Sequence, residues 1–174
     1  VDGLLDDPDV VAVSFVGSTP IARYIYETGT ANGKRVQALG GAKNHMVVLP
    51  DADIDMAADA AVSAAYGAAG ERCMAISVTV AVGDIADDLV RAIAARIPKL
   101  TIGDGAQPST DMGPLITAEH RDKVASYIDA GARSGARVIV DGREAELPSE
   151  GFFLGTTLLD GVRRRRSGAL VVRG

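Results

Sequence analysis

The chain alternates between short apolar, β-branched runs and longer segments whose apolar residues recur at helical spacing. Runs of the first kind predict strands at residues 10–16, 35–39, 45–49, 76–82, 137–140 and 152–159. Segments of the second kind predict helices at residues 21–28, 51–69, 86–97 and 117–132. Because strands alternate with helices, the pattern predicts an α/β fold, a mostly parallel sheet with flanking helices.

Glycine, proline and aspartate mark the ends of these elements. Residues 17–20, Gly-Ser-Thr-Pro, separate the first strand from the first helix, where Ser18 or Thr19 can cap and a proline suits the first turn. Asp53 opens the second helix with a negative charge at its positive end. We expect Gly70 to end that helix after about Ala69.

Composition excludes several classes of protein. Hydrophobic residues make up 47% and charged residues 24%, and no run of 18 uncharged apolar residues is present, so no membrane span is expected. The net charge of −5 argues against nucleic acid as a partner. Arg163–Arg166 could bind phosphate or an acidic partner, but we interpret them as a solvated tail segment.

A single cysteine, Cys73, cannot form an internal disulfide, and no Cys/His cluster at zinc spacing predicts a metal site. A reducing compartment follows: the cytoplasm, or the mitochondrial matrix in a eukaryote. Cys73 lies between a glycine and the strand at 76–82, where it can be exposed and where free N–H groups and Arg72 would favour the thiolate. The alternative is an inert, buried thiol, because free cysteines are often buried.

Two glycine turns could bind a ligand. The turn at 17–19 offers backbone N–H groups and a helix dipole to an anion, although it could also be a simple helix cap. The glycines in 39–41 allow a ligand to approach the backbone, although they could also form only a tight turn. His45 and His120 are interpreted as structural; a cysteine hydrolase would need one of them within hydrogen-bond reach of Cys73.

In six segments, the chain resembles the aldehyde dehydrogenase superfamily. They are FVGST at 15–19, LGG at 39–41, DAD at 51–53, GERC at 70–73, GPLI at 113–116, and GFF with TLL within 151–159. The resemblance covers residues 1 to about 162 and is strongest, at 36–53 and 69–75, to the CoA-acylating methylmalonate-semialdehyde dehydrogenase branch. It implies the end of a Rossmann-like coenzyme domain at 1–41, part of a catalytic domain at 42–162 and a divergent tail at 163–174.

The resemblance implies a role for each matching residue. Cys73 would be the nucleophile that holds the substrate as a thioester. The pyrophosphate of NAD would lie against Gly17, Ser18 and Thr19, and the nicotinamide near the backbone of Leu39 and Gly40. The implied reaction oxidises the small aldehydes methylmalonate or malonate semialdehyde to propionyl-CoA or acetyl-CoA, with coenzyme A as acyl acceptor and loss of carbon dioxide. The parent protein would be a homodimer or homotetramer.

Two departures from the family pattern matter. Hydrolytic relatives have a glutamate just before LGG that activates water, whereas this chain has Ala38, so attack by coenzyme A should be favoured over hydrolysis. Glu71 is not assigned as a base because neighbouring side chains usually diverge. The Glu-x-Phe-Gly-Pro motif expected after residue 162 is absent. We therefore expect a fragment that is inactive alone, or else a non-catalytic remnant or interaction module.

Overall fold

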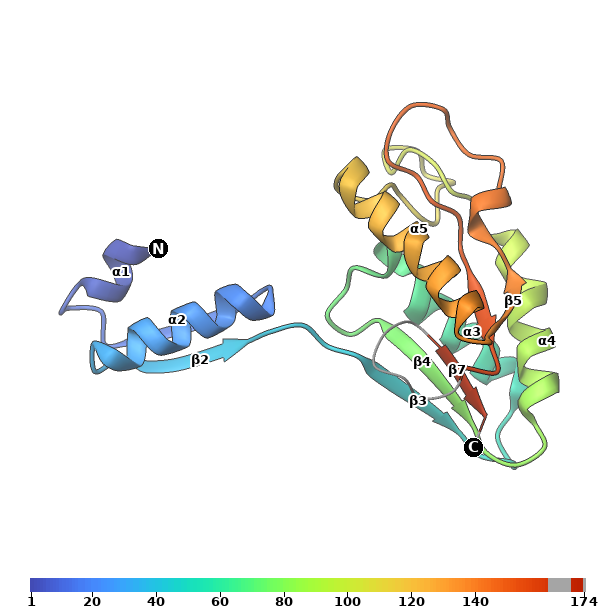
Figure 1. The fold of residues 1–174 in the computed structure, drawn as a ribbon, viewed down its shortest axis with the longest axis horizontal. Coiled ribbons are helices and arrows are strands. Elements are labelled where there is room, and N and C mark those ends of the chain that lie inside the picture. The colour runs from blue at the N-terminus through green and yellow to red at the C-terminus, as the bar shows by residue number, and fades with distance from the viewer. Residues whose placement is uncertain (163–169, 174) are drawn as a thin grey trace. The chain divides into compact units, whose positions relative to one another are not determined.

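A computed structural model describes residues 1–162 and 170–173 of the chain (Figure 1). The helices are α1 (Asp2–Asp6), α2 (Thr19–Ala31), α3 (Ile54–Tyr66), α4 (Ala86–Arg96) and α5 (Ala118–Arg133). Short 3-10 turns are found at Gly67–Gly70, Ile97–Lys99 and Gly142–Glu144. The strands are β1 (Ala12–Val16), β2 (Arg35–Leu39), β3 (Asn44–Val48), β4 (Ile76–Ala81), β5 (Arg137–Val140), β6 (Leu158–Asp160) and β7 (Leu170–Arg173). They form two compact units, Val1–Ala42 and Lys43–Gly174.

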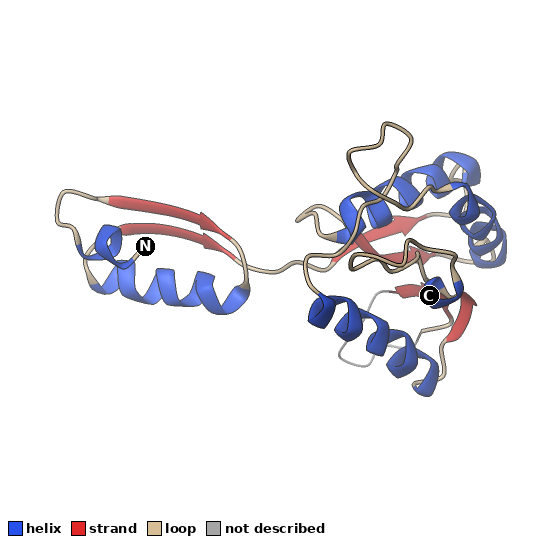
Figure 2. Ribbon diagram, turned by 90° about the horizontal axis from the view of Figure 1, so that it is seen from above, coloured by secondary structure: helices blue, strands red, loops and turns tan. Residues whose placement is uncertain are grey.

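The first unit is a parallel pair of strands, β1 and β2, with α2 packed along one face (Figure 2). Burial alternates along both strands, as expected when only one face of a sheet is covered. Gly29 lets the helix approach β2 closely, since a Cβ there would lie 2.7 Å from Val36 Cγ2. Lys34 is buried, and its ammonium group donates to the carbonyl oxygens of Asp7 at 2.5 Å and Val10 at 2.6 Å.

The second unit contains two small sheets. Parallel strands in the order β3-β4-β7 form one, and the antiparallel pair β5-β6 forms the other. The register between β3 and β4 shifts by one residue, from Asn44 opposite Ile76 to His45 opposite Val78. This β-bulge lies at the amino ends of both strands.

The core of the second unit lies between α3, α4 and the β3-β4 pair. Leu89 and Ala58 are fully buried where the two helices face each other. Asp53 caps α3 through its carboxylate, which accepts from the Met56 amide at 3.0 Å. The other buried members of this core are Val48, Ala61, Val62, Ala81, Ala86, Val90, Ile93, Ile97 and Leu158.

The predicted α/β class with a mostly parallel sheet is confirmed, and most predicted elements form. Two boundaries were wrong. The second helix ends at Tyr66 rather than near Ala69, because Ala68 and Ala69 take left-handed backbone angles. The last predicted strand, at 152–159, is reduced to β6, which starts at Leu158 and runs antiparallel to β5.

Within the described residues, no helix combines the length and apolar character needed to cross a bilayer. Arg163–Arg166, interpreted above as a solvated tail segment, lie outside the described residues.

Candidate active site

Cys73 occupies the second position of a tight turn just before β4. The Ala75 amide donates to the Arg72 carbonyl at 3.0 Å, which closes the turn with Cys73 and Met74 at its tip. The Cys73 thiol is exposed, as is Met74, while Ala75 is buried and anchors the turn to the unit. The alternative that Cys73 is buried is therefore wrong.

Two side chains hold this turn. The Arg72 guanidinium donates to the carbonyl oxygen of Ser63 at 2.8 Å, which also accepts from the Gly67 amide at the end of α3. The Asn44 amide donates to the carbonyl oxygens of Cys73 at 2.8 Å and Ala75 at 2.9 Å. The Arg72 guanidinium is thus directed to a helix carbonyl.

A left-handed segment connects α3 to the Cys73 turn. Ala68 has φ 52° and Ala69 φ 53°, and Gly70 follows at φ 74°. Such angles cost an L-residue roughly 1–2 kcal/mol each relative to the right-handed region. Strained backbone of this kind is often found at functional sites, where the surrounding structure must hold it in place.

Neither histidine serves as a base for the thiol. His45 Nδ1 lies 2.8 Å from the Lys43 carbonyl oxygen. His120 Nε2 lies 3.6 Å from Glu71 Oε1. Within residues 1–162 and 170–173, no hydrogen bond joins either ring to Cys73 Sγ, so the arrangement required by a cysteine hydrolase is not formed.

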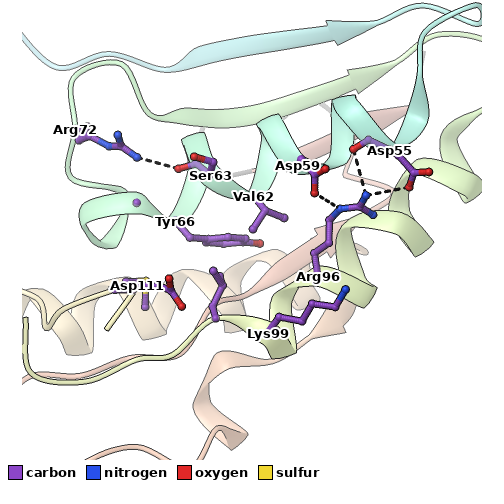
Figure 3. A pocket seen from close by; sticks show the side chains of 12 residues that line it. Asp55, Asp59, Val62, Ser63, Tyr66, Arg72, Arg96, Lys99 and Asp111 are labelled. Carbon is purple, nitrogen blue, oxygen red and sulfur yellow. Dashed lines mark hydrogen bonds and ion pairs between the residues drawn. The ribbon is translucent and has the colours of Figure 1, made fainter. Parts of the chain in front are cut away.

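A cavity of about 870 Å³ lies beside α3 and is lined by charged groups of both signs (Figure 3). Arg96 crosses from α4 and donates to Asp59 at 2.5 Å and to Asp55 at 2.9 Å. The hydrogen bond from Arg96 lowers the pKa of the Asp59 carboxyl. The Tyr66 side chain also lines this cavity; burial raises the pKa of its hydroxyl, which donates to the Thr157 carbonyl at 3.0 Å.

A second cavity, of about 650 Å³, lies between α5, β4 and residues 154–159. Its wall is largely apolar, with Val124 and Ile128 contributed by α5. Glu71 and His120 line it as well. Cys73 lines neither of these two cavities, so the thiol faces solvent from its turn.

The two glycine turns predicted to bind a ligand meet in the first unit. The Gly17 amide donates to the Leu39 carbonyl at 3.1 Å. The Gly41 amide donates to Thr19 Oγ1 at 3.0 Å, and a Cβ at Gly40 would lie 2.7 Å from the same oxygen. Glycine is thus needed at position 40 for the two turns to approach each other.

Ser18 is the N-cap residue of α2, but its hydroxyl makes no capping hydrogen bond. The first turn of α2 contains no acidic residue, and the turn from Gly17 to Thr19 is exposed. The hydroxyl and the amino end of the helix are therefore free to meet a solvent-borne anion.

Ala38 lies on the half-buried side of β2, in the alternation that turns Val36 toward α2. A methyl group occupies the position where hydrolytic relatives were expected to carry a glutamate. This position therefore supplies no proton acceptor.

Fold and site together define an α/β protein that presents one exposed thiol at the amino end of a parallel strand. The family model for the aldehyde dehydrogenase family matches residues 1–169. The chain belongs to the aldehyde dehydrogenase family.

Several relatives extend this assignment. The malonate-semialdehyde dehydrogenase of Pseudomonas aeruginosa is 58% identical over 165 residues, 93% of this chain and 33% of that protein. The malonate-semialdehyde dehydrogenase 2 of Shouchella clausii is 52% identical over 162 residues, again 93% of this chain and 33% of that protein. The chain therefore spans about a third of the length of these curated relatives.

Solved structures agree with the sequence relatives. The methylmalonate-semialdehyde dehydrogenase DddC from Oceanimonas doudoroffii is 50% identical, with a TM-score of 0.93 over 99% of this chain and 38% of that one. A Sinorhizobium meliloti 1021 protein solved in complex with NAD is 47% identical, with a TM-score of 0.92 over the same shares. The predicted resemblance to the aldehyde dehydrogenase superfamily, and within it to the semialdehyde dehydrogenases, is confirmed.

Sequence reasoning missed the side chains that hold the Cys73 turn. Asn44 was seen only as part of the segment after LGG, and Ser63 only as an ordinary helix position. Asn44 lies 29 residues from Cys73 in the chain, and no local pattern signals a contact at that separation. The one available signal was its place at the start of a strand, three residues after Gly41.

Proposed function

We propose that this chain carries the nucleophile and part of the coenzyme-binding surface of an NAD-dependent malonate- or methylmalonate-semialdehyde dehydrogenase. The observation that carries the proposal is the single, exposed Cys73 on a turn held by two side chains. Its support from outside the chain is the likeness to enzymes named for these two semialdehydes.

Cys73 does the covalent chemistry in this proposal. Its thiolate attacks the aldehyde carbon to form a carbon–sulfur bond, and NAD, when bound, supplies the acceptor for the hydride that leaves this carbon. The acyl group then remains on Cys73 as a thioester. A thioester suits transfer because thiolate is both a good nucleophile and a good leaving group.

Ala38 supports coenzyme A as the acceptor of the acyl group. General-base activation of water contributes about 10²–10⁴-fold where a suitable side chain is present, and alanine provides none. The thiolate of coenzyme A needs no such base: it attacks the thioester, its new carbon–sulfur bond forms and the bond to Cys73 breaks. Loss of carbon dioxide from the malonyl skeleton would leave acetyl-CoA or propionyl-CoA as the product.

The residues of the first unit fit the pyrophosphate of NAD. The Gly17–Thr19 turn is exposed, Ser18 has a hydroxyl without a capping bond, and α2 begins without an acidic residue that would repel an anion. In the proposed arrangement the role of these residues is to bind and orient. The backbone of Leu39 and Gly40 lies beside this turn and would approach the nicotinamide.

Since the chain spans a third of its curated relatives, we further propose that these 174 residues do not turn over alone. The test is to mix the chain with NAD, coenzyme A and malonate semialdehyde and to follow NADH by absorbance. No turnover is expected. Turnover at the rates of ordinary enzymes, on the order of 1–10³ per second, would contradict this part of the proposal.

The thioester step can be tested without NAD. p-Nitrophenyl acetate should acetylate Cys73 with release of p-nitrophenolate, and added coenzyme A should then remove the acetyl group as acetyl-CoA. Both steps are followed by intact mass and by the absorbance of nitrophenolate. Cys73→Ser is the control, since it removes the only thiol. If acetylation were no faster than that of a free peptide thiol, Cys73 would not be an activated nucleophile.

A further inference from the structure

Asn44 makes an unusual pair of contacts with the Cys73 turn. Both protons of its amide nitrogen are used, one toward the Cys73 carbonyl at 2.8 Å and one toward the Ala75 carbonyl at 2.9 Å. The two acceptors flank Met74, which is 76% exposed. A single half-buried side chain therefore spans the tip of the turn.

The β-bulge at Asn44 makes these contacts possible. Regular pairing between β3 and β4 resumes at His45 opposite Val78, so Ser77 is the extra residue on β4. Bulges of this kind bend a strand and redirect a side chain. Asn44 is the first residue of β3 and lies just before the shift, and its side chain reaches back past Ile76 to the turn.

Two further hydrogen bonds hold the turn around Cys73. The Ala75 amide closes the turn on the Arg72 carbonyl, and Arg72 ties the preceding residue to α3. The peptide that follows Cys73 is held by the Asn44 amide. Because the direction of this carbonyl is set by ψ of Cys73, a fixed carbonyl removes one of the rotations that would swing the thiol.

We propose that Asn44 is a positioning residue: it holds the peptide after Cys73 through its side-chain amide and thereby sets the direction of the thiol. This inference rests on the proposed role of Cys73 as nucleophile. An amide carries no charge at any ordinary pH, so the effect is geometric rather than electrostatic. It needs a donor with two protons, which aspartate, leucine and serine do not provide.

The test uses Asn44→Leu in the full 174-residue chain. Leucine has nearly the shape of asparagine but donates nothing, and it adds no charge near the thiol. The matched control is Asn32→Leu in the other unit, since the Asn32 amide likewise donates to two acceptors, the Leu5 carbonyl at 2.9 Å and Asp6 Oδ1 at 3.1 Å. Far-ultraviolet circular dichroism establishes that each variant is folded.

The first measurement is the mobility of a nitroxide label on Cys73, the only thiol. We expect the spectrum of Asn44→Leu to narrow, because the turn moves more freely, and that of Asn32→Leu to match the parent. Equal spectra for Asn44→Leu and the parent would overturn the proposal. So would equal narrowing in both variants, which would indicate a general loss of stability.

The second measurement is the rate of Cys73 acetylation by p-nitrophenyl acetate across pH. A misplacement of 1 Å can cost on the order of 10²-fold in rate, so we expect the plateau rate at high pH to fall by about tenfold in Asn44→Leu. The pH midpoint should stay unchanged because no charge was altered. A shifted midpoint with an unchanged plateau would contradict a geometric role.

If Asn44→Leu does not fold, Asn44→Ser decides the matter, since one hydroxyl proton can serve only one of the two carbonyls. A label mobility above that of the parent is expected, and parent-like mobility would overturn the proposal. Failure of the proposed function gives a different outcome: a slow thiol in the parent itself, while the mobility difference between the Asn44 and Asn32 variants persists.

Discussion

The backbone just before Cys73 is left-handed at Ala68. Replacing Ala68 by glycine measures the strain that this conformation stores. Ala68 is exposed and has φ 52° and ψ 41°. An L-residue loses roughly 1–2 kcal/mol in this region, which glycine does not. Glycine in turn costs roughly 0.5–1 kcal/mol through the greater freedom of the unfolded chain. We therefore expect Ala68→Gly to raise the free energy of unfolding by about 0.5–1 kcal/mol.

The control for this variant is the same substitution at an exposed alanine with right-handed angles. Ala60 lies within α3, where Ala→Gly should lower the free energy of unfolding by about 1 kcal/mol. For a chain of this size, about 1 kcal/mol corresponds to a shift of roughly 2–4 °C in melting temperature. The two variants should thus move the melting temperature in opposite directions.

Thermal unfolding followed by circular dichroism suits this comparison because the chain contains no tryptophan. Urea unfolding at 25 °C provides a second measure of the same difference. If Ala68→Gly destabilised the chain as much as Ala60→Gly does, position 68 could not be left-handed. The left-handed angles could then not be the reason why α3 ends at Tyr66.

Three further predictions concern the core, the helix caps and alkaline pH. Leu89→Ala, at a fully buried position, should lower the free energy of unfolding by about 2–5 kcal/mol in urea titrations, and a loss below about 1 kcal/mol would show that the site is not packed as described. Asp53→Ala should lower the free energy of unfolding by about 1 kcal/mol, because it removes the hydrogen bond from the Met56 amide. Ser18→Ala should lower it little, since the Ser18 hydroxyl makes no capping hydrogen bond. Equal losses in the two variants would contradict this difference. Burial raises the pKa of Tyr66, so the folded state keeps a proton that the unfolded state releases above about pH 10. The free energy of unfolding should therefore fall as pH rises past that value. Tyr66→Phe should flatten this alkaline decline, and an unchanged pH dependence would exclude Tyr66 as its source.

The sequence predicted the elements that depend on local pattern. Alternating or continuous apolar runs marked β1 to β5, and the acidic Asp53 marked the start of α3, because both signals depend on neighbours within a few residues. The end of α3 was placed too late because alanine favours helix, and nothing local shows that Ala68 and Ala69 turn left-handed.

The candidate site was predicted only in part. The meeting of the 17–19 and 39–41 turns follows from adjacent parallel strands, so their shared edge could be expected from the fold class. The roles of Arg72 and Asn44 could not, because each depends on a side chain reaching a backbone carbonyl of a distant element. Such contacts are decided by tertiary packing, which a linear pattern does not encode.

An exposed thiol that is also the only thiol limits the covalent states of the chain. In air, two copies can each give up one electron and one proton to an oxidant and join through Cys73. No further linkage can follow, since neither copy has a second sulfur to offer. Preparations without reductant should therefore show one additional band on a non-reducing gel, that of a covalent dimer. The intensity of this band should report the fraction of Cys73 that has been oxidised to the disulfide.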